Sequence, residues 1–226
     1  PDAGRIMILG DMALFIIPDV EGPFFPLVGI FDLRNKRELL AGQGLSWRIE
    51  FKKSGKNIFL DSFDDELKAR TNINPDGFQV DWQTQYCRIK CIFRLKPSRL
   101  ETEIHVESLD DNVLISNISY PSITLAQLAS GQDRMLHPVG QILEDPSNRP
   151  FMVPGSVYYP SSHAAMQFGA YYDDGGGLYF AYEDPDGVMK KFSVLGRKNC
   201  VQLSWHSFAP WQVGQTGKNG YKTNGS

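Results

Sequence analysis

The sequence has no long apolar run and no long run of one charge. None of its apolar stretches approaches the roughly 20 residues that a helix needs to cross a bilayer. The 23 basic and 26 acidic residues are spread along 226 positions and leave a net charge of −3. Nucleic-acid binding needs a basic patch, and Lys52-Lys53 and Lys190-Lys191 are only pairs. The sequence therefore predicts neither a membrane partner nor a nucleic-acid partner.

Cysteine is also scarce, with three residues and no Cys-x-x-Cys motif that would indicate zinc. Cys87 and Cys91 stand four positions apart in a strand-like stretch, which places them on one face about 13 Å apart. A disulfide needs Cα atoms within about 7 Å, so these two cannot pair with each other. Cys200 could reach one of them only through a tertiary contact. We expect free, buried thiols.

Motifs that bind cofactors or metals are missing as well. Gly42-Gln43-Gly44 lacks the third glycine and the following helix of a dinucleotide-binding loop. Residues 184–187 resemble the start of a calcium loop, but Pro185 and the missing bidentate glutamate make a hairpin turn the better interpretation. Serine hydrolase elbows and zinc-protease helices do not occur. We predict no cofactor and no metal.

Alternation of apolar and polar residues dominates the sequence, and helical periodicity is weak. Only residues 61–70 and 123–129 could form a helical turn or two. Residues 86–95 and 99–107 alternate on either side of Lys96-Pro97-Ser98, which predicts a hairpin. Further strands are expected at 5–9, 12–17, 26–31, 45–51, 78–82, 113–118, 166–172, 178–183, 188–195 and 200–208. This pattern predicts an all-β fold, a large antiparallel β-sandwich, and excludes a (β/α)₈ barrel.

The chain is expected to form one domain over residues 1–226. No internal repeat divides it, and 42% hydrophobic residues suffice for one sizeable core. Residues 131–160 are rich in proline and glycine and predict a long loop, of the kind that often carries function. The missing initiator Met and the glycine-rich end are typical of a segment cut from a longer chain. For that reason the sequence leaves open a secreted, a periplasmic or a cytoplasmic location.

Candidate binding residues come from the 131–160 segment and from residues 205–211 near the end of the chain. Sugar rings stack their C–H faces on aromatic side chains, while polar groups bind their hydroxyls. Residues that could supply this mixture are Asp133, Arg134, His137, Trp205, His206 and Trp211. The alternative for each one is a core tryptophan or a surface ion pair. The adjacent acids 64–66 and 110–111 offer no convincing pair for glycoside hydrolysis, so no catalytic residue is predicted.

The order of the segments resembles a known type of domain. Residues 11–51, with Ile30-Phe31-Asp32-Leu33 and Leu45-Ser46-Trp47, look like the opening of the galactose-mutarotase-like sandwich domains that precede catalytic barrels in glycoside hydrolases. Residues 106–115 followed by 120–123 are similar to a later part of those domains. Residues 166–180 and 184–190 resemble a largely uncharacterised family of proposed bacterial glycoside hydrolases. This resemblance implies the sandwich fold and a barrel soon after it in the full protein.

The resemblance carries no catalytic signature, because its motifs are strands and turns. We therefore expect a non-catalytic sandwich that supports the barrel of a glycoside hydrolase, its partner within the same polypeptide, and that contributes to carbohydrate binding. Two alternatives remain, a free-standing carbohydrate-binding module and an enzyme similar to aldose epimerases. Sugar mutarotases use a histidine and a carboxylate as acid and base, and the sequence offers no clear match. The fragment is not expected to be active alone.

Overall fold

The computed structural model describes residues 4–18, 25–97, 99–128, 132–137, 142–144, 146, 156–160, 166–183, 189–208 and 221–225. These residues contain strands and no helix, which confirms the predicted fold class. The described part of the chain accordingly has no helix that could cross a membrane. It also contains no group of three or more His, Cys, Asp or Glu side chains arranged to hold a metal ion.

The largest sheet has six antiparallel strands in the order β14-β17-β18-β11-β5-β6. Their bounds are Ser156–Tyr159 (β14), Lys190–Arg197 (β17), Cys200–Phe208 (β18), Val113–Ala126 (β11), Leu40–Lys53 (β5) and Lys56–Asp61 (β6). Along β5, Trp47, Ile49 and Phe51 are buried in the core, as the alternation predicted. Ser46 and Arg48 therefore belong to the opposite, outer face of this sheet.

Three smaller antiparallel sheets complete the fold. The five-stranded sheet has the order β19-β10-β9-β8-β7, with bounds Tyr221–Gly225 (β19), Arg99–Ser108 (β10), Cys87–Lys96 (β9), Gly77–Gln83 (β8) and Arg70–Asn74 (β7). One four-stranded sheet comprises β1 (Arg5–Leu9), β2 (Met12–Ile16), β3 (Leu27–Asp32) and β4 (Arg37–Glu38). The other has the order β13-β12-β15-β16, with bounds Ile142–Glu144 (β13), Arg134–Leu136 (β12), Phe168–Asp173 (β15) and Gly176–Ala181 (β16).

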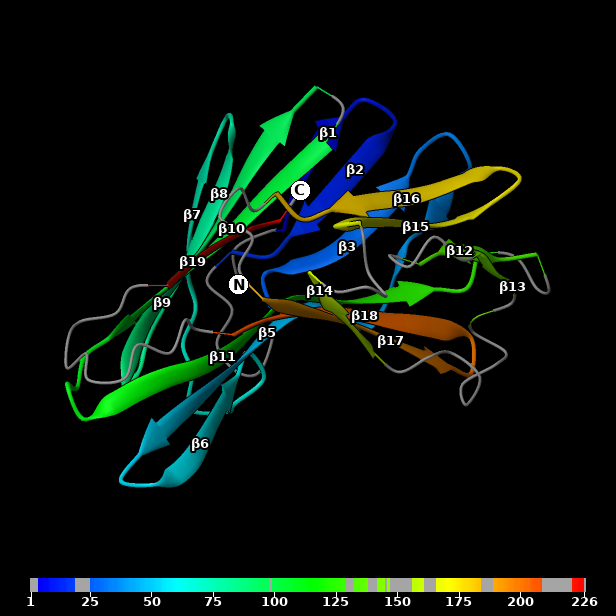
Figure 1. Ribbon diagram of the computed structural model, residues 1–226. Helices are drawn as coiled ribbons and strands as arrows, with labels where there is room; N and C mark the ends of the chain where they lie inside the picture. Colours follow the sequence, from blue (N-terminus) through cyan, green and yellow to red (C-terminus); the bar gives the residue numbers. More distant parts are fainter. Residues whose placement is uncertain are drawn as a thin grey trace.

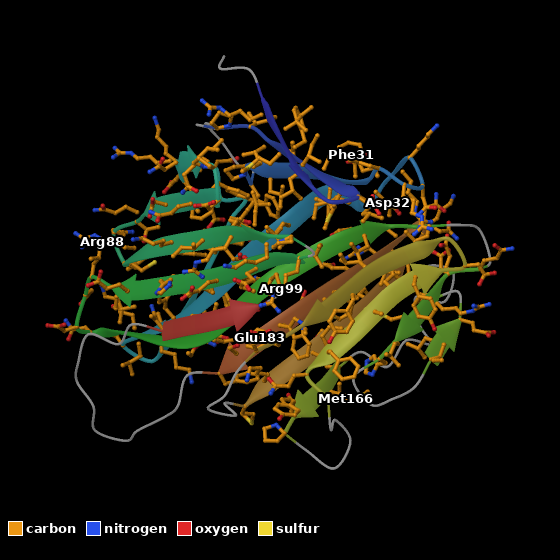
Figure 2. The ribbon with its side chains drawn as sticks, turned by 90° about the horizontal axis from the view of Figure 1, so that it is seen from above. Phe31, Asp32, Arg88, Arg99, Met166 and Glu183 are labelled. Atoms are coloured by element: carbon orange, nitrogen blue, oxygen red, sulfur yellow. The ribbon has the colours of Figure 1, made fainter. Side chains whose placement is uncertain are left out.

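The core lies between the six-stranded sheet and the smaller sheets above it (Figure 1). Trp47 of β5 meets Trp82 of β8 edge to face, with ring centroids 5.5 Å apart. Phe192 of β17 stacks on Phe180 of β16 at 5.7 Å. Seen from above, the five-stranded sheet and the β15–β16 hairpin lie side by side, and Arg99 approaches Glu183 to 3.6 Å (Figure 2). One apolar layer thus holds all the sheets together.

The structure corrects several local expectations. Neither predicted helical turn exists: residues 61–70 form turns that lead into β7, and Ile123 to Ala126 continue β11. The segment 131–160 is not one long loop, because β12, β13 and β14 lie within it. The glycine-rich end contributes β19, which pairs with β10. The predicted turn at 184–187 lies outside the described residues.

Candidate functional site

The outer face of the six-stranded sheet carries a continuous row of serines. One serine from each of five neighbouring strands lies in register with the next: Ser46 on β5, Ser122 on β11, Ser204 on β18, Ser193 on β17 and Ser156 on β14. Strands are spaced by about 4.8 Å, so the row extends over about 19 Å. Ser156 is exposed and Ser46, Ser193 and Ser204 are partly exposed, whereas Ser122 at the centre is 8% exposed. We call these five residues the serine row.

A bulge in β11 makes the serine row possible. Ser119 and Ser122 are three residues apart, and that spacing would put them on opposite faces of a regular strand. The register shifts between them, so that they align with residues only two apart on both neighbouring strands. The extra residue of the bulge allows both serines to face outward. Tyr120, between them, points inward, and its hydroxyl contacts Thr102 on β10.

Four larger polar side chains and Ser119 form a second row beside the serine row. It runs in register from Arg48 on β5 through Ser119 on β11, His206 on β18 and Lys191 on β17 to Tyr158 on β14. We call these five residues the cationic row. Tyr158 is half exposed, and its ring stacks against Phe208 with centroids 6.2 Å apart. At the other end, the Arg48 guanidinium lies 5.1 Å from the centre of the Phe59 ring.

Within each row, a hydrogen bond links β11 to its neighbour β18. Ser119 Oγ is 2.7 Å from Nδ1 of His206, and Ser122 Oγ is 2.7 Å from Ser204 Oγ. Burial, together with the charge of Lys191, lowers the pKa of His206 to about 4. His206 is therefore neutral at pH 7 and presents both a donor and an acceptor nitrogen. Since a hydroxyl can donate or accept, Ser119 can adapt to either tautomer.

This face can bind hydroxyl-rich ligands, but it is not built like a hydrolase. A serine nucleophile needs a base with a pKa near neutrality and a third group that orients the base. His206 has a pKa of about 4, and among the described residues its charged neighbour is the cation Lys191. Hydroxyls, a neutral imidazole, two cations and a stacked aromatic pair are instead groups that recognise sugars.

The five predicted binding residues that the structure describes do not converge on one place. Asp133 is fully buried, accepts a hydrogen bond from the Leu128 backbone and contacts the Tyr171 hydroxyl. His137 is also buried, at the edge of the Phe192 ring, and burial lowers its pKa to about 4. Arg134 pairs with Asp174 at 3.0 Å near the surface.

The predicted tryptophans give a similar result. Trp205 is 3% exposed and packs against Phe192 and Tyr182, so it belongs to the core. Trp211 lies outside the described residues. His206 is thus the predicted residue that the structure places on the outer polar face. The alternation in 45–51 and 200–208 could have indicated Ser46, Arg48 and Ser204 too, but not that their strands share β11 as a neighbour.

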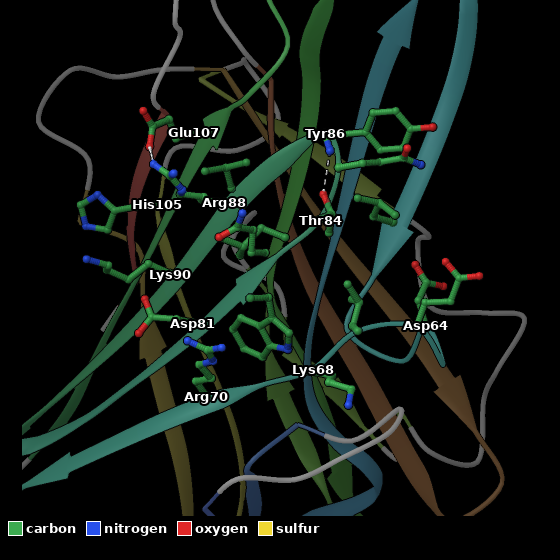
Figure 3. A pocket seen from close by; sticks show the side chains of 18 of the residues that line it. Asp64, Lys68, Arg70, Asp81, Thr84, Tyr86, Arg88, Lys90, His105 and Glu107 are labelled. Atoms are coloured by element: carbon green, nitrogen blue, oxygen red, sulfur yellow. Dashed lines mark hydrogen bonds and ion pairs between the residues drawn. The ribbon is translucent and has the colours of Figure 1, made fainter.

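A separate groove lies at one end of the five-stranded sheet (Figure 3). Its volume is about 1860 Å³, and it reaches from the 64–68 segment across the outer face of β8, β9 and β10. Its lining mixes acids with bases, so neither sign of charge dominates. The acidic, basic and histidine side chains that line it are Asp64, Asp65, Glu66, Lys68, Arg70, Asp81, Arg88, Lys90, His105 and Glu107.

A histidine and a carboxylate come close together beside this groove. Nε2 of His105 lies 2.7 Å from Oε1 of Glu103, whose other oxygen accepts from Arg94 at 2.8 Å. Burial, with the nearby charges of Lys90 and Arg94, lowers the pKa of His105. Glu103 is almost fully buried on the outer face of β10 and is held by Arg94. Arg94 and Glu103 thus form an ion pair, and the His105 imidazole lies against it.

No protein-family model matches the sequence, and no curated protein matches it. Solved structures share the fold at low identity. A proposed aldose 1-epimerase from Escherichia coli K12 is 11% identical, with a TM-score of 0.64 over 99% of this chain and 97% of that one. A galactose mutarotase related enzyme from Lactobacillus acidophilus is 9% identical, with a TM-score of 0.62 over 99% and 96%.

A much longer enzyme contains the same fold. The α-N-acetylgalactosaminidase of Bifidobacterium bifidum, solved with GalNAc, is 10% identical, with a TM-score of 0.60 over 98% of this chain. The match spans 35% of that enzyme's chain. The present chain therefore has a galactose-mutarotase-like β-sandwich fold, as the sequence resemblance implied. This fold occurs both in chains of similar length and as one part of a longer glycosidase.

Proposed function

We propose that this chain is a non-catalytic carbohydrate-binding sandwich domain, and that the serine row is the floor of its binding site. The observation that carries the proposal is the β11 bulge, which brings Ser119 and Ser122 onto one face with His206. Core packing does not require a bulge that aligns hydroxyls on the outer side of a sheet. A floor about 19 Å long supports an oligosaccharide as the ligand.

The aromatic pair Tyr158 and Phe208 supplies the apolar part of this site. Tyr158 is 50% exposed on the outer face, and a sugar could stack its C–H face on this aromatic pair. The neutral His206 and the serine hydroxyls would then bind the sugar hydroxyls. This division of roles matches the usual composition of small-molecule sites, in which a few polar groups fix the orientation.

The test is a calorimetric and NMR titration of the protein with galactosides, glucans and mucin-type sugars. We expect at least one of them to bind and to shift the signals of His206. Tyr158→Ala should weaken that binding about tenfold or more, whereas Tyr179→Ala should leave it unchanged. Tyr179 is a matched control, because it is 63% exposed on β16, in a different sheet. Equal losses in both variants, or no binding at all, would reject the proposal.

The proposed setting of the domain is a longer glycoside hydrolase, in which it packs against a catalytic barrel. The match to 35% of a glycosidase chain supports this setting. Reading the gene on both sides of these 226 residues tests it directly. A run of alternating strands and helices with acidic residues at the strand ends is the expected result. A stop codon directly after Ser226 would favour a free-standing module.

The second candidate is an aldose epimerase, which the nearly full-length matches to epimerase-like chains favour. Epimerisation needs an acid and a base near the sugar ring. The close histidine–carboxylate pair is His105 and Glu103, and Arg94 already binds Glu103. We expect polarimetry with galactose and glucose to show no acceleration of anomer interconversion. A measurable acceleration that His105→Ala removes would establish the enzyme instead.

A further inference from the structure

We propose that the Lys191 end of the cationic row selects sugars that carry an anionic group, a carboxylate or a sulfate, over their neutral counterparts. This inference rests on the proposed function of the outer face and names the class of ligand. The observation behind it is a cation whose register neighbours in the described part of the chain include no carboxylate. The anion would lie between the Lys191 ammonium and the His206 imidazole, next to the Tyr158 ring.

The charges around Lys191 can be followed strand by strand. Its register neighbours are His206 on β18 and Tyr158 on β14. Ser193 follows on β17, two residues on, and Ser204 is its partner on β18. Among the described residues, no ion-pair partner of Lys191 is found. Lys191 is partly buried, and a lysine that no described carboxylate neutralises can bind an anion as its counter-ion.

The opposite end of the cationic row is different. Arg48 lies beside the Phe59 ring and has Asp61 as its register partner on β6. Glu50 follows two residues further along β5, on the same outer face. Arg48 thus has carboxylates among its neighbours on the outer face, while Lys191 has none among the described residues. This asymmetry places the anion at the β17–β18 end of the site.

His206 makes the binding of an anion at this place measurable. Its pKa is about 4, because the site is buried and Lys191 repels a second positive charge. An anion beside both groups offsets that repulsion and favours the protonated imidazole. The pKa of His206 should therefore rise when an acidic sugar binds. A neutral sugar would leave it unchanged or lower it further by displacing water.

The experiment compares sugars that differ only at C6. The protein is titrated with methyl galactoside and methyl glucoside, and with the methyl glycosides of galacturonic and glucuronic acid. NMR measures both the affinity and the His206 pKa in each case. We expect the uronates to bind about fivefold to tenfold more tightly. The preference should shrink between about 10 mM and about 1 M salt, because the screening length falls from about 30 Å to about 3 Å.

Two lysine variants locate the effect. Lys191→Gln should abolish the preference for uronates and raise the His206 pKa of the free protein. Lys56→Gln removes the same charge from the exposed hairpin between β5 and β6 and should change neither result. Equal binding of neutral and acidic sugars would overturn the selectivity alone. A preference that survives in Lys191→Gln would do the same, and the absence of binding by every sugar would overturn both proposals.

Discussion

Ser119 and His206 are 87 positions apart in the chain, yet Ser119 Oγ lies 2.7 Å from the imidazole Nδ1. The pKa of His206 is about 4 in the folded protein, as is that of the buried His137. An unfolded histidine has a pKa near 6.5, so between pH 6.5 and 4 the unfolded chain binds more protons. We predict that stability falls over this window by up to about 3 kcal/mol per histidine. Urea unfolding at a series of pH values measures the change.

A variant can separate this effect from acid denaturation in general. His137→Phe keeps an aromatic ring against Phe192 but removes one of the titrating groups. The slope of stability against pH between 6.5 and 4 should then decrease, and the remaining slope comes from His206 and from His105, whose pKa is also lowered. Asp110 and Asp173, whose pKa values are lowered, lose their contribution mainly below pH 4 and do not account for this window. An unchanged slope in the variant would contradict the assignment.

The contact between Trp47 and Trp82 joins the six-stranded sheet to the five-stranded sheet. Both side chains are almost fully buried, and Phe25 packs against Trp82 at 5.4 Å. Trp82→Ala should therefore cost about 3–5 kcal/mol of unfolding free energy, because a large cavity remains between the sheets. Phe59→Ala removes a half-exposed ring on β6 and should lower the unfolding free energy by less than about 1 kcal/mol. Denaturant unfolding of both variants gives the comparison.

Alternation along single strands was sufficient to predict the core side of this interface. Trp47 and Trp82 stand in regular apolar–polar stretches, and both are buried as that pattern implies. The serine row could not be predicted from the sequence, because it depends on which strands are neighbours in the sheet. Strand pairing is decided by tertiary packing, and the bulge between Ser119 and Ser122 changes the apparent face of one serine.

The incorrect helical turn at 61–70 has a local physical cause. Asp64, Asp65 and Glu66 are followed by residues 67–70, which all have high helix propensity. In the fold, the Asp61 carboxylate accepts from the Phe63 backbone, and the Asp64 carboxylate accepts from the Asp61 backbone. Such side-chain bonds to the backbone compete with helix formation. The residues that follow pair as β7, a short polar edge strand with little apolar alternation of its own.

Arg37 on β4 and Asp173 on β15 connect two sheets. The guanidinium donates a bidentate pair of hydrogen bonds to the carboxylate, with nitrogen–oxygen distances of 2.6 and 3.1 Å. Burial opposes ionisation of Asp173, but the hydrogen bonds and charge of Arg37 outweigh it and lower the pKa of the carboxyl. Asp173→Asn should cost about 1–3 kcal/mol, because Arg37 loses a charged partner in a largely buried position. Asp174→Asn breaks only the more exposed pair with Arg134 and should change stability by less than about 0.5 kcal/mol. Similar losses in the two variants would show that Arg37 is not a link between the sheets.

The three thiols should differ in reactivity in the folded protein. All three are free, as the sequence predicted, and Cys87 and Cys91 are buried, whereas Cys200 is only half-buried. Burial raises the pKa of Cys87 to about 11 and that of Cys91 well above its ordinary value. Since the thiolate is the reactive form, a thiol reagent at pH 8 should modify at most Cys200 quickly. Full reaction of all three is expected only in denaturant, and rapid modification of Cys87 in the native state would show that the sheets separate at this end.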